Sequence, residues 1–200
     1  MSTSVHVSRE TKATLETFAA LLLRWNRTVN LIGRRDESAL WSRHIDDSLQ
    51  LVPLIPPGTL RGIDLGTGGG FPGLVLAIAT AIPFDLVEVD HRKAAFLREA
   101  GRVTGAPVRV HAVRAEAAAL EPASLVTSRA LALLSRLLEL ATPVLAPGGT
   151  CLFLKGISVE SELTAAAAEW HMRVTRVPSQ TGPGACILRI SDIARADNST

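Results

Sequence analysis

The chain has 200 residues, of which 47% are hydrophobic and 20% are charged, and its formal net charge is +2 at pH 7. This apolar content suits one domain with a substantial core and excludes an intrinsically disordered protein. So small a net charge does not by itself indicate a nucleic-acid-binding protein.

The sequence lacks the patterns of membrane and secreted proteins. Its apolar runs end well before the ~18 residues that a membrane span requires, and residues 1–6 lack the apolar core of a signal peptide. Cys151 and Cys186 lie in apolar, strand-like settings, where buried thiols are more common than a disulfide, and two cysteines without clustered histidines make no zinc site. We therefore expect a cytoplasmic protein without a bound metal.

Two helices are predicted at the start of the chain. Apolar residues recur at helical spacing over residues 8–30, and a second helix over residues 37–54 would place His44 and Asp47 on one face. Basic residues interleaved with acids gather in this segment: Arg24, Arg27, Arg34, Arg35, Arg43 and His44. They predict either a basic face for a polyanion or an ordinary solvated helix surface.

From residue 60 onward, strand patterns alternate with helical ones, as in a parallel sheet covered on both faces. The predicted strands are residues 62–65, 84–89, 108–113, 125–127, 150–154, 172–177 and 185–190, with helices beginning near Pro72, Arg92, Glu116, Leu133 and Glu160. No helical pattern separates the last two strands, which indicates an antiparallel hairpin. We expect an N-terminal helical lobe (1–59), a Rossmann-like α/β domain (60–191) with a seven-stranded, mainly parallel sheet and an antiparallel last strand, and a polar tail (192–200), with fraying from Ser191.

Residues 61–73, Arg-Gly-Ile-Asp-Leu-Gly-Thr-Gly-Gly-Gly-Phe-Pro-Gly, are typical of a buried strand, a glycine-rich loop and a helix start. Gly66, Gly68 and Gly70 leave no Cβ between the backbone and a ligand, so the loop is predicted to hold a nucleotide-like cofactor. Pro72 suits the first helical position, and Gly73 allows the helix to pack closely on the sheet.

Two cofactor classes fit this loop. The spacing from Gly66 is usual in S-adenosylmethionine enzymes, whereas Gly68, Gly70 and Gly73 fit the dinucleotide pattern of a nicotinamide-dependent oxidoreductase. Asp64 favours the methyl donor, because a carboxylate repels a pyrophosphate but attracts an ammonium and a sulfonium. The terminal hairpin is also the usual methyltransferase outline. A glycine-rich turn without a ligand is the remaining alternative.

Polar residues at the ends of the second and third strands are candidates for cofactor contacts. Glu88 is predicted to accept hydrogen bonds from the ribose hydroxyls; Asp90 is the alternative, unless it caps the next helix. The backbone at Ala115 and Glu116 is predicted to contact the adenine edge, although Glu116 equally suits a first helical turn.

Arg129 and Lys155 follow the fourth and fifth strands, where an acceptor must approach. Arg129 suits a phosphate or base contact; Lys155 suits the same role or that of a solvated lysine in a turn. The sequence offers no Asn-Pro-Pro-Tyr-type motif and no cysteine placed to attack a pyrimidine, so no general base is assigned. This absence fits an acceptor with a free lone pair, such as a purine ring nitrogen.

Six motifs together carry a family resemblance: Trp25–Leu31, His44–Leu49, Asp64–Gly73, Arg114–Glu116, Ser128–Ala130 and Lys155–Gly156. Over nearly its whole length the chain resembles the bacterial 16S ribosomal RNA guanine-N7 methyltransferase family, also called RsmG or GidB, the glucose-inhibited division protein B. One departure is Glu88, where many relatives have Asp.

The resemblance implies S-adenosylmethionine as cofactor, S-adenosylhomocysteine as product and N7 of a guanosine in 16S RNA as acceptor. It implies a donor site lined by Gly66, Gly68, Phe71, Glu88, Ala115, Glu116 and Arg129, to which the loop pattern adds Gly70. It also implies that the N-terminal lobe helps to receive RNA or the small ribosomal subunit. The candidate RNA contacts are Arg27, Arg34, Arg35, His44, Arg129 and Lys155. We expect a monomer; the alternative to an enzyme is a ribosome-binding module without turnover.

Overall fold

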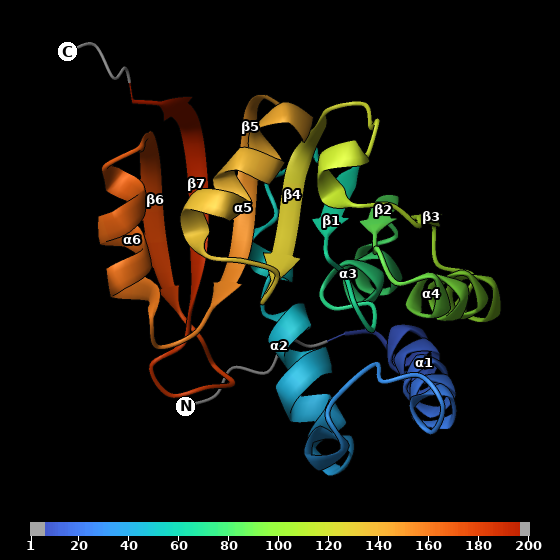
Figure 1. The fold of residues 1–200 in the computed structure, drawn as a ribbon. Coiled ribbons are helices and arrows are strands. Elements are labelled where there is room, and N and C mark those ends of the chain that lie inside the picture. Colours follow the sequence, from blue (N-terminus) through green and yellow to red (C-terminus); the bar gives the residue numbers. More distant parts are fainter. Residues whose placement is uncertain (1–6, 197–200) are drawn as a thin grey trace.

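A computed structural model describes residues 7–196, which form a seven-stranded sheet between two layers of helices (Figure 1). The strand order is β3-β2-β1-β4-β5-β7-β6; β1 to β5 run parallel, and β7 is antiparallel to both of its neighbours. The strands are β1 (Gly62–Leu65), β2 (Phe84–Val87), β3 (Val108–His111), β4 (Ala123–Arg129), β5 (Leu145–Lys155), β6 (Trp170–Pro178) and β7 (Cys186–Arg195). The predicted fold class is confirmed.

The sheet has a separate apolar core on each face. Consecutive strand residues point to opposite faces, so Leu86 packs in one core and Val87 in the other. The first core contains side chains of α1 (Arg9–Asn26), α3 (Gly73–Thr80) and α4 (His91–Thr104), and the second contains those of α5 (Leu134–Ala141) and α6 (Val159–Ala167). Among residues 7–196, no helix is long and apolar enough to cross a membrane.

Helix α1 begins close to its predicted start but ends earlier than predicted. Ser8 caps its N-terminus by accepting a hydrogen bond from the Thr11 amide at 3.1 Å. The helix stops at Asn26 because the Asn26 side-chain oxygen accepts hydrogen bonds from the amides of Leu31 and Ile32, at 2.8 and 3.0 Å. These bonds turn the chain out of the helix.

The predicted second helix is not one regular helix. The chain forms a 3₁₀ segment (Arg34–Ala39), a π-helical turn (Trp41–Ile45), the short α2 (Asp46–Leu49) and a last 3₁₀ turn (Val52–Leu54). Pro53 supplies no backbone N–H, so a regular helix cannot continue through this last turn. Buried residues of these segments share the first core with α1 and α3. In Figure 1 the arrowheads of β1, β2 and β4 point toward α1 and α2.

Several further segments differ from the prediction: β3 ends at His111 rather than at residue 113, and β5 begins at Leu145 rather than at residue 150. The helix expected near Glu116 is a single 3₁₀ turn, Ala115–Ala117, because Pro122 and the start of β4 leave no room for more turns. Strand β2 ends at Val87 rather than at Val89. The next residue, Glu88, binds the backbone amides of Gly68 and Asp90 through its side chain. Residues 191–195 are not frayed but pair with β6; residues 1–6 and 197–200 lie outside the described part of the chain.

Candidate functional site

The glycine-rich loop between β1 and α3 depends on left-handed backbone conformations. Gly66, Gly68 and Gly70 have φ angles of +68°, +57° and +95°, which side chains rarely tolerate. The amides of Gly66 and Thr67 donate to the Val87 carbonyl at 3.0 and 3.1 Å and hold the loop against β2. A Cβ on Gly68 would meet nothing closer than the Gly66 carbonyl oxygen at 4.0 Å. The backbone at Gly68 is therefore open to a ligand.

Glu88 is joined directly to this loop. One carboxylate oxygen accepts from the Gly68 amide at 2.9 Å and the other from the Asp90 amide at 2.8 Å, and the residue is 7% exposed. Asp90 plays a structural role instead. Its exposed carboxylate caps α4 by accepting from the amides of Arg92 and Lys93, and these hydrogen bonds lower its pKa. The geometry favours Glu88 over Asp90 as the acid that faces a ligand.

A cavity of about 290 Å³ lies at the carboxyl ends of β1, β2 and β3. Five predicted donor-site residues line it: Gly66, Gly68, Glu88, Ala115 and Glu116. Sequence patterns gave no signal for several others, namely Val89, Lys93, Val113 and Leu131, whereas Ala130 ends the Ser128–Ala130 motif. Gly70, Phe71 and Arg129 do not line this cavity, so their predicted cofactor contacts have no support from its shape. We call it the donor cavity.

Asp64 is not among the residues that line the donor cavity, so the expected direct attraction between its charge and the methyl donor has no support from the cavity. Its fully buried carboxylate accepts from the Gly73 amide at 3.0 Å and from the Thr127 hydroxyl at 2.8 Å. Burial raises its pKa to about 6. A Cβ on Gly73 would lie 2.5 Å from the Asp64 Cβ, so the predicted close packing of α3 on the sheet is confirmed.

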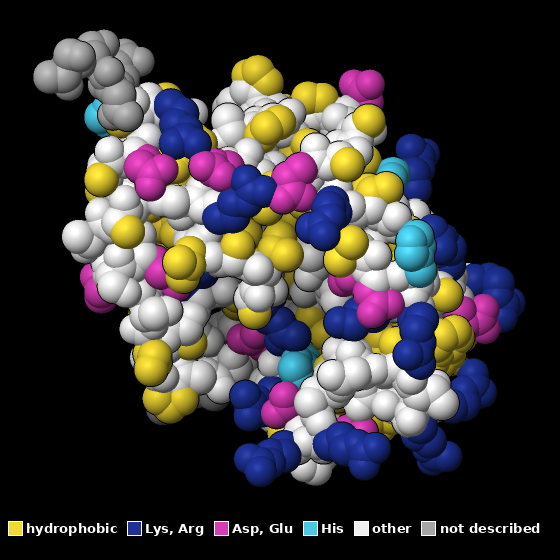
Figure 2. Space-filling model, in the orientation of Figure 1, with side chains coloured by type: hydrophobic (Ala, Val, Ile, Leu, Met, Phe, Trp, Pro, Cys, Tyr) yellow, Lys and Arg dark blue, Asp and Glu magenta, His cyan; other side chains and the backbone are white. Residues whose placement is uncertain are grey.

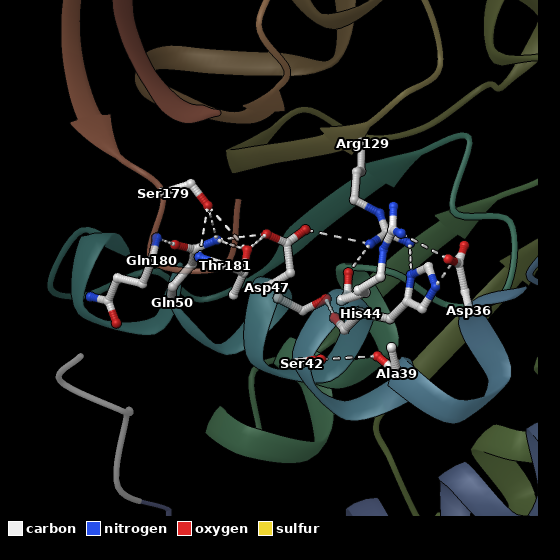
Figure 3. A network of polar contacts seen from close by, with 12 residues as sticks. Asp36, Ala39, Ser42, His44, Asp47, Gln50, Arg129, Ser179, Gln180 and Thr181 are labelled. Atoms are coloured by element: carbon white, nitrogen blue, oxygen red, sulfur yellow. Dashed lines mark hydrogen bonds and ion pairs between the residues drawn. The ribbon is translucent and has the colours of Figure 1, made fainter. Parts of the chain in front are cut away.

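Arg129 extends from β4 to the N-terminal helices, as Figure 3 shows. Its guanidinium lies 2.7 Å from His44 Nδ1 and 3.4 Å from a carboxylate oxygen of Asp47, and it donates to the Arg43 carbonyl at 3.1 Å. It also lies over the ring of Phe71, 5.1 Å from the centroid, and the His44 ring stacks on Phe71 at 5.0 Å. His44 and Asp47, predicted to lie on one helix face, both contact the Arg129 guanidinium.

The same network reaches the loop between β6 and β7. Asp47 accepts hydrogen bonds from the Gln50 side-chain amide, at 2.7 Å, and from the Thr181 hydroxyl, while the Gln50 oxygen accepts from the Gln180 amide at 2.9 Å. Burial, and next the charge of Arg129, lower the pKa of His44 to about 4. His44 is therefore neutral at pH 7 and accepts a hydrogen bond from Arg129 rather than presenting a charge to RNA.

Lys155 is not the solvated lysine of a turn. It is 8% exposed, forms an ion pair with Glu162 at 2.5 Å and donates to the Ala132 carbonyl at 3.0 Å. Its charge is thereby compensated within the protein. By contrast, Arg27, Arg34 and Arg35 are exposed. In Figure 2, Lys and Arg side chains spread over the lower edge and right side of the molecule, where Figure 1 places α1 and α4.

The cysteines carry no reactive thiol. Cys151 and Cys186 are free and buried, as predicted, and burial raises the pKa of each. Within residues 7–196, no three His, Cys, Asp or Glu side chains gather as a metal site would require.

Comparison with known proteins identifies the protein family of this chain. The family model described as GidB, rRNA small subunit methyltransferase G, matches residues 11–184. The chain belongs to this family. It is 56% identical over 189 residues to the ribosomal RNA small subunit methyltransferase G of Gluconobacter oxydans, covering 94% of this chain and 97% of that one. The corresponding protein of Acidiphilium cryptum is 57% identical over 193 residues, covering 95% of this chain and 89% of that one.

Solved structures agree on the fold of this GidB-family chain. An O-methyltransferase from Bacillus cereus superposes with a TM-score of 0.60 at 16% identity, covering 94% of this chain and 93% of that one. A ribosomal protein L11 methylase from Lactobacillus delbrueckii subsp. bulgaricus also gives 0.60, at 15% identity, covering 74% and 78%. At such low identity these likenesses show the fold alone. Family membership, rather than the position of Asp64, decides between the two cofactor classes that fit the glycine spacing.

Proposed function

We propose that this GidB-family protein transfers a methyl group from S-adenosylmethionine to N7 of a guanosine in 16S ribosomal RNA. The observation that carries the proposal is the Glu88 carboxylate bound to the Gly68 amide at one wall of the donor cavity, in a chain of this family. The bound cofactor would supply a methyl group made electrophilic by the sulfonium.

The donor cavity offers the groups that this cofactor requires. Each Glu88 oxygen accepts one amide hydrogen and keeps a second lone pair, which can accept a hydrogen bond from a ribose hydroxyl. The side chains of Val89 and Val113 are partly exposed and apolar, as suits the faces of an adenine. Gly68 admits the ligand to its backbone because no Cβ stands in the way.

Methyl transfer to guanine N7 needs no general base, because this nitrogen carries a lone pair and no proton. The protein contributes by holding the two reactants in line and by keeping water out. Arg129 is bound to His44 and Asp47. Its role in our proposal is therefore to join β4 to the N-terminal helices, and not to bind an RNA phosphate. The exposed Arg27, Arg34 and Arg35 would bind RNA phosphates.

The N-terminal segment, residues 1–59, would thus act as the RNA-receiving part of a monomeric enzyme, with residues 60–191 holding the donor. Because the proposed substrate is ribosomal RNA, we place the reaction in the cytoplasm.

The proposal is tested by incubating the purified protein with methyl-tritiated S-adenosylmethionine and small ribosomal subunits from cells that lack the activity. Tritium in 7-methylguanosine after nucleoside analysis is the expected result. Donor binding without any labelled nucleoside would favour a ribosome-binding module without turnover. Spectral titration with NADH should show no binding; a stoichiometric response would favour the oxidoreductase.

A further inference from the structure

A buried ion pair lies between the end of β5 and the first turn of α6. Lys155 Nζ is 2.5 Å from a Glu162 oxygen, and the two side chains are only 6% and 7% exposed. Burying two charges is costly and often adds no net stability to a fold. The position of this pair therefore calls for an explanation other than stability.

Both members of the pair also bind the backbone of the loop that follows β4. Lys155 Nζ donates to the Ala132 carbonyl at 3.0 Å, and the Leu134 amide donates to Glu162 at 2.9 Å. The Ser158 hydroxyl donates to the other Glu162 oxygen at 2.8 Å and fixes that side chain. The pair thus fastens residues 130–134 at two points, which we call the loop tethers.

This loop forms a wall of the donor cavity. Ala130 and Leu131 line the donor cavity and also a neighbouring cavity of about 380 Å³, which Lys155 and Glu162 line as well. Leu131 lies against the glycine-rich loop: a Cβ on Gly66 would be 2.5 Å from its Cδ1 atom. The position of this loop therefore sets one wall of the donor cavity.

The loop backbone is strained at its first residue. Ala130 has a φ of +54°, in the left-handed region that residues other than glycine rarely adopt. Such a conformation persists only where the surrounding structure enforces it. The loop tethers hold the chain two and four residues further on, at Ala132 and Leu134.

We propose that Lys155 and Glu162 are positioning residues for methyl transfer, holding residues 130–134 so that Ala130 and Leu131 keep the donor-cavity wall, and with it the donor, in place for the incoming base. The inference rests on the proposed function. Neither residue lines the donor cavity, so both act through the loop. In-line transfer depends steeply on geometry, and a displacement of about 1 Å can lower a rate by about 10²-fold.

The double variant Lys155→Met/Glu162→Leu tests this inference, because it removes both loop tethers without leaving a lone buried charge. The expected result is a kcat for RNA methylation at least tenfold lower. The Kd for S-adenosylmethionine should stay within threefold, because Glu88 and the glycine-rich loop are untouched. Hydrogen exchange of the amides of residues 130–134 should become faster.

A matched control removes the exposed ion pair between Glu160 and Arg176. Glu160 lies on α6, as Glu162 does, but this pair does not contact residues 130–134. The variant Arg176→Met/Glu160→Leu should keep kcat, donor affinity and loop exchange unchanged. If the first double variant fails to fold, Lys155→Met/Glu162→Gln keeps the side-chain volume and an acceptor for the Leu134 amide but removes the tether to Ala132, and its kcat should fall at least threefold.

The outcomes separate the two proposals. If Lys155→Met/Glu162→Leu, or Lys155→Met/Glu162→Gln, methylates RNA within twofold of the unaltered protein, the positioning role is overturned and the proposed function is left intact. An unaltered protein that binds the donor but labels no RNA overturns the proposed function instead. If the amides of residues 130–134 exchange hydrogen equally slowly with and without the ion pair, the pair does not hold this loop, whatever the activity.

Discussion

Arg129 Nη2 lies 2.7 Å from His44 Nδ1, so a guanidinium at the end of β4 is hydrogen-bonded to a neutral histidine of the N-terminal helices. This contact joins the part of the chain that holds the donor cavity to the part that carries the exposed arginines. The Asp47 carboxylate on the same guanidinium, at 3.4 Å, ties the β6–β7 loop to the same place.

The depressed pKa of His44 predicts a pH dependence of stability. Folded His44 titrates at about pH 4, against 6.5 for a free imidazole, so between these pH values only the unfolded chain takes up the proton. The stabilisation that His44 contributes is complete above about pH 6.5 and is lost as the pH falls toward 4, a change on the order of 3 kcal/mol.

Chemical denaturation of the unaltered protein and of His44→Gln, from pH 7.5 to pH 4.5, measures this contribution as a difference. Taking the difference also removes the opposite contribution of Asp64, whose raised pKa favours the folded state as the pH falls. The difference in unfolding free energy should shrink as the pH falls. A difference that stays constant across the range would mean that His44 titrates normally in the folded protein.

Substitutions of Glu88 and Asp90 should have different effects, because Glu88 is expected to bind the cofactor and Asp90 caps α4. Glu88→Gln keeps the side-chain volume but loses the charge, and we expect S-adenosylmethionine affinity to fall about tenfold or more, since a ribose hydroxyl loses a charged acceptor. Asp90→Ala should instead cost about 1 kcal/mol of stability through loss of the α4 cap. Its donor Kd, measured by isothermal titration calorimetry, should change less than twofold; the reverse pattern would assign the ribose to Asp90.

The exposed arginines of the N-terminal segment should account for part of the salt dependence of RNA binding. In the triple variant Arg27→Gln/Arg34→Gln/Arg35→Gln, the slope of log K against log salt concentration should become less steep by about 2, if each residue neutralises one phosphate. Donor affinity should not change.

The matching control is Arg173→Gln/Arg176→Gln/Arg189→Gln, which removes three exposed arginines from β6 and β7, at the sheet edge opposite β3. Filter-binding titrations at several salt concentrations compare the two triple variants. Equal slopes for both would show that the net charge of the protein matters, rather than the N-terminal surface.

Gly73 should be intolerant of any side chain. An alanine Cβ at this position would lie 2.5 Å from the Asp64 Cβ and 2.7 Å from the Leu86 side chain, so α3 must shift away from the sheet. We expect Gly73→Ala to lower the unfolding free energy by about 1–3 kcal/mol. Gly156→Ala, where nothing lies within 4 Å of the added carbon, should change it by less than about 0.5 kcal/mol. Equal thermal shifts for both variants would refute the packing argument.

Sequence patterns located most of this fold because its local signals are strong. Apolar strand patterns marked all seven strands, and the terminal hairpin followed from the lack of a helical pattern before β7. The segment around Trp41–Ile45 was misjudged because its shape depends on contacts with Arg129, which is distant in sequence. Residues 191–195 were misjudged because polar side chains on an exposed strand resemble a tail.

The candidate site was predictable where it consists of backbone and less so where it depends on side-chain partners. Glycine spacing located the loop, and the strand ends located Glu88 and Ala115. The burial of Lys155 depends on Glu162, which carries no motif, and Leu131 is an exposed apolar residue without any local signal. The hydrogen bonds of Asp64 to Gly73 and Thr127 were not predictable, because a sequence does not show which groups a buried carboxylate meets.

Cleavage of 16S RNA at the methylated base is the most direct test of the proposed reaction. Small subunits that lack the modification are incubated with the protein and S-adenosylmethionine, and the extracted RNA is treated with borohydride and then aniline, which cleave the chain where guanine N7 is methylated. Methyl transfer to N7 predicts one new cleavage site that requires both protein and cofactor. Methyl label in the RNA without new cleavage would contradict N7 as the acceptor, and unlabelled RNA would contradict the methyl transfer itself.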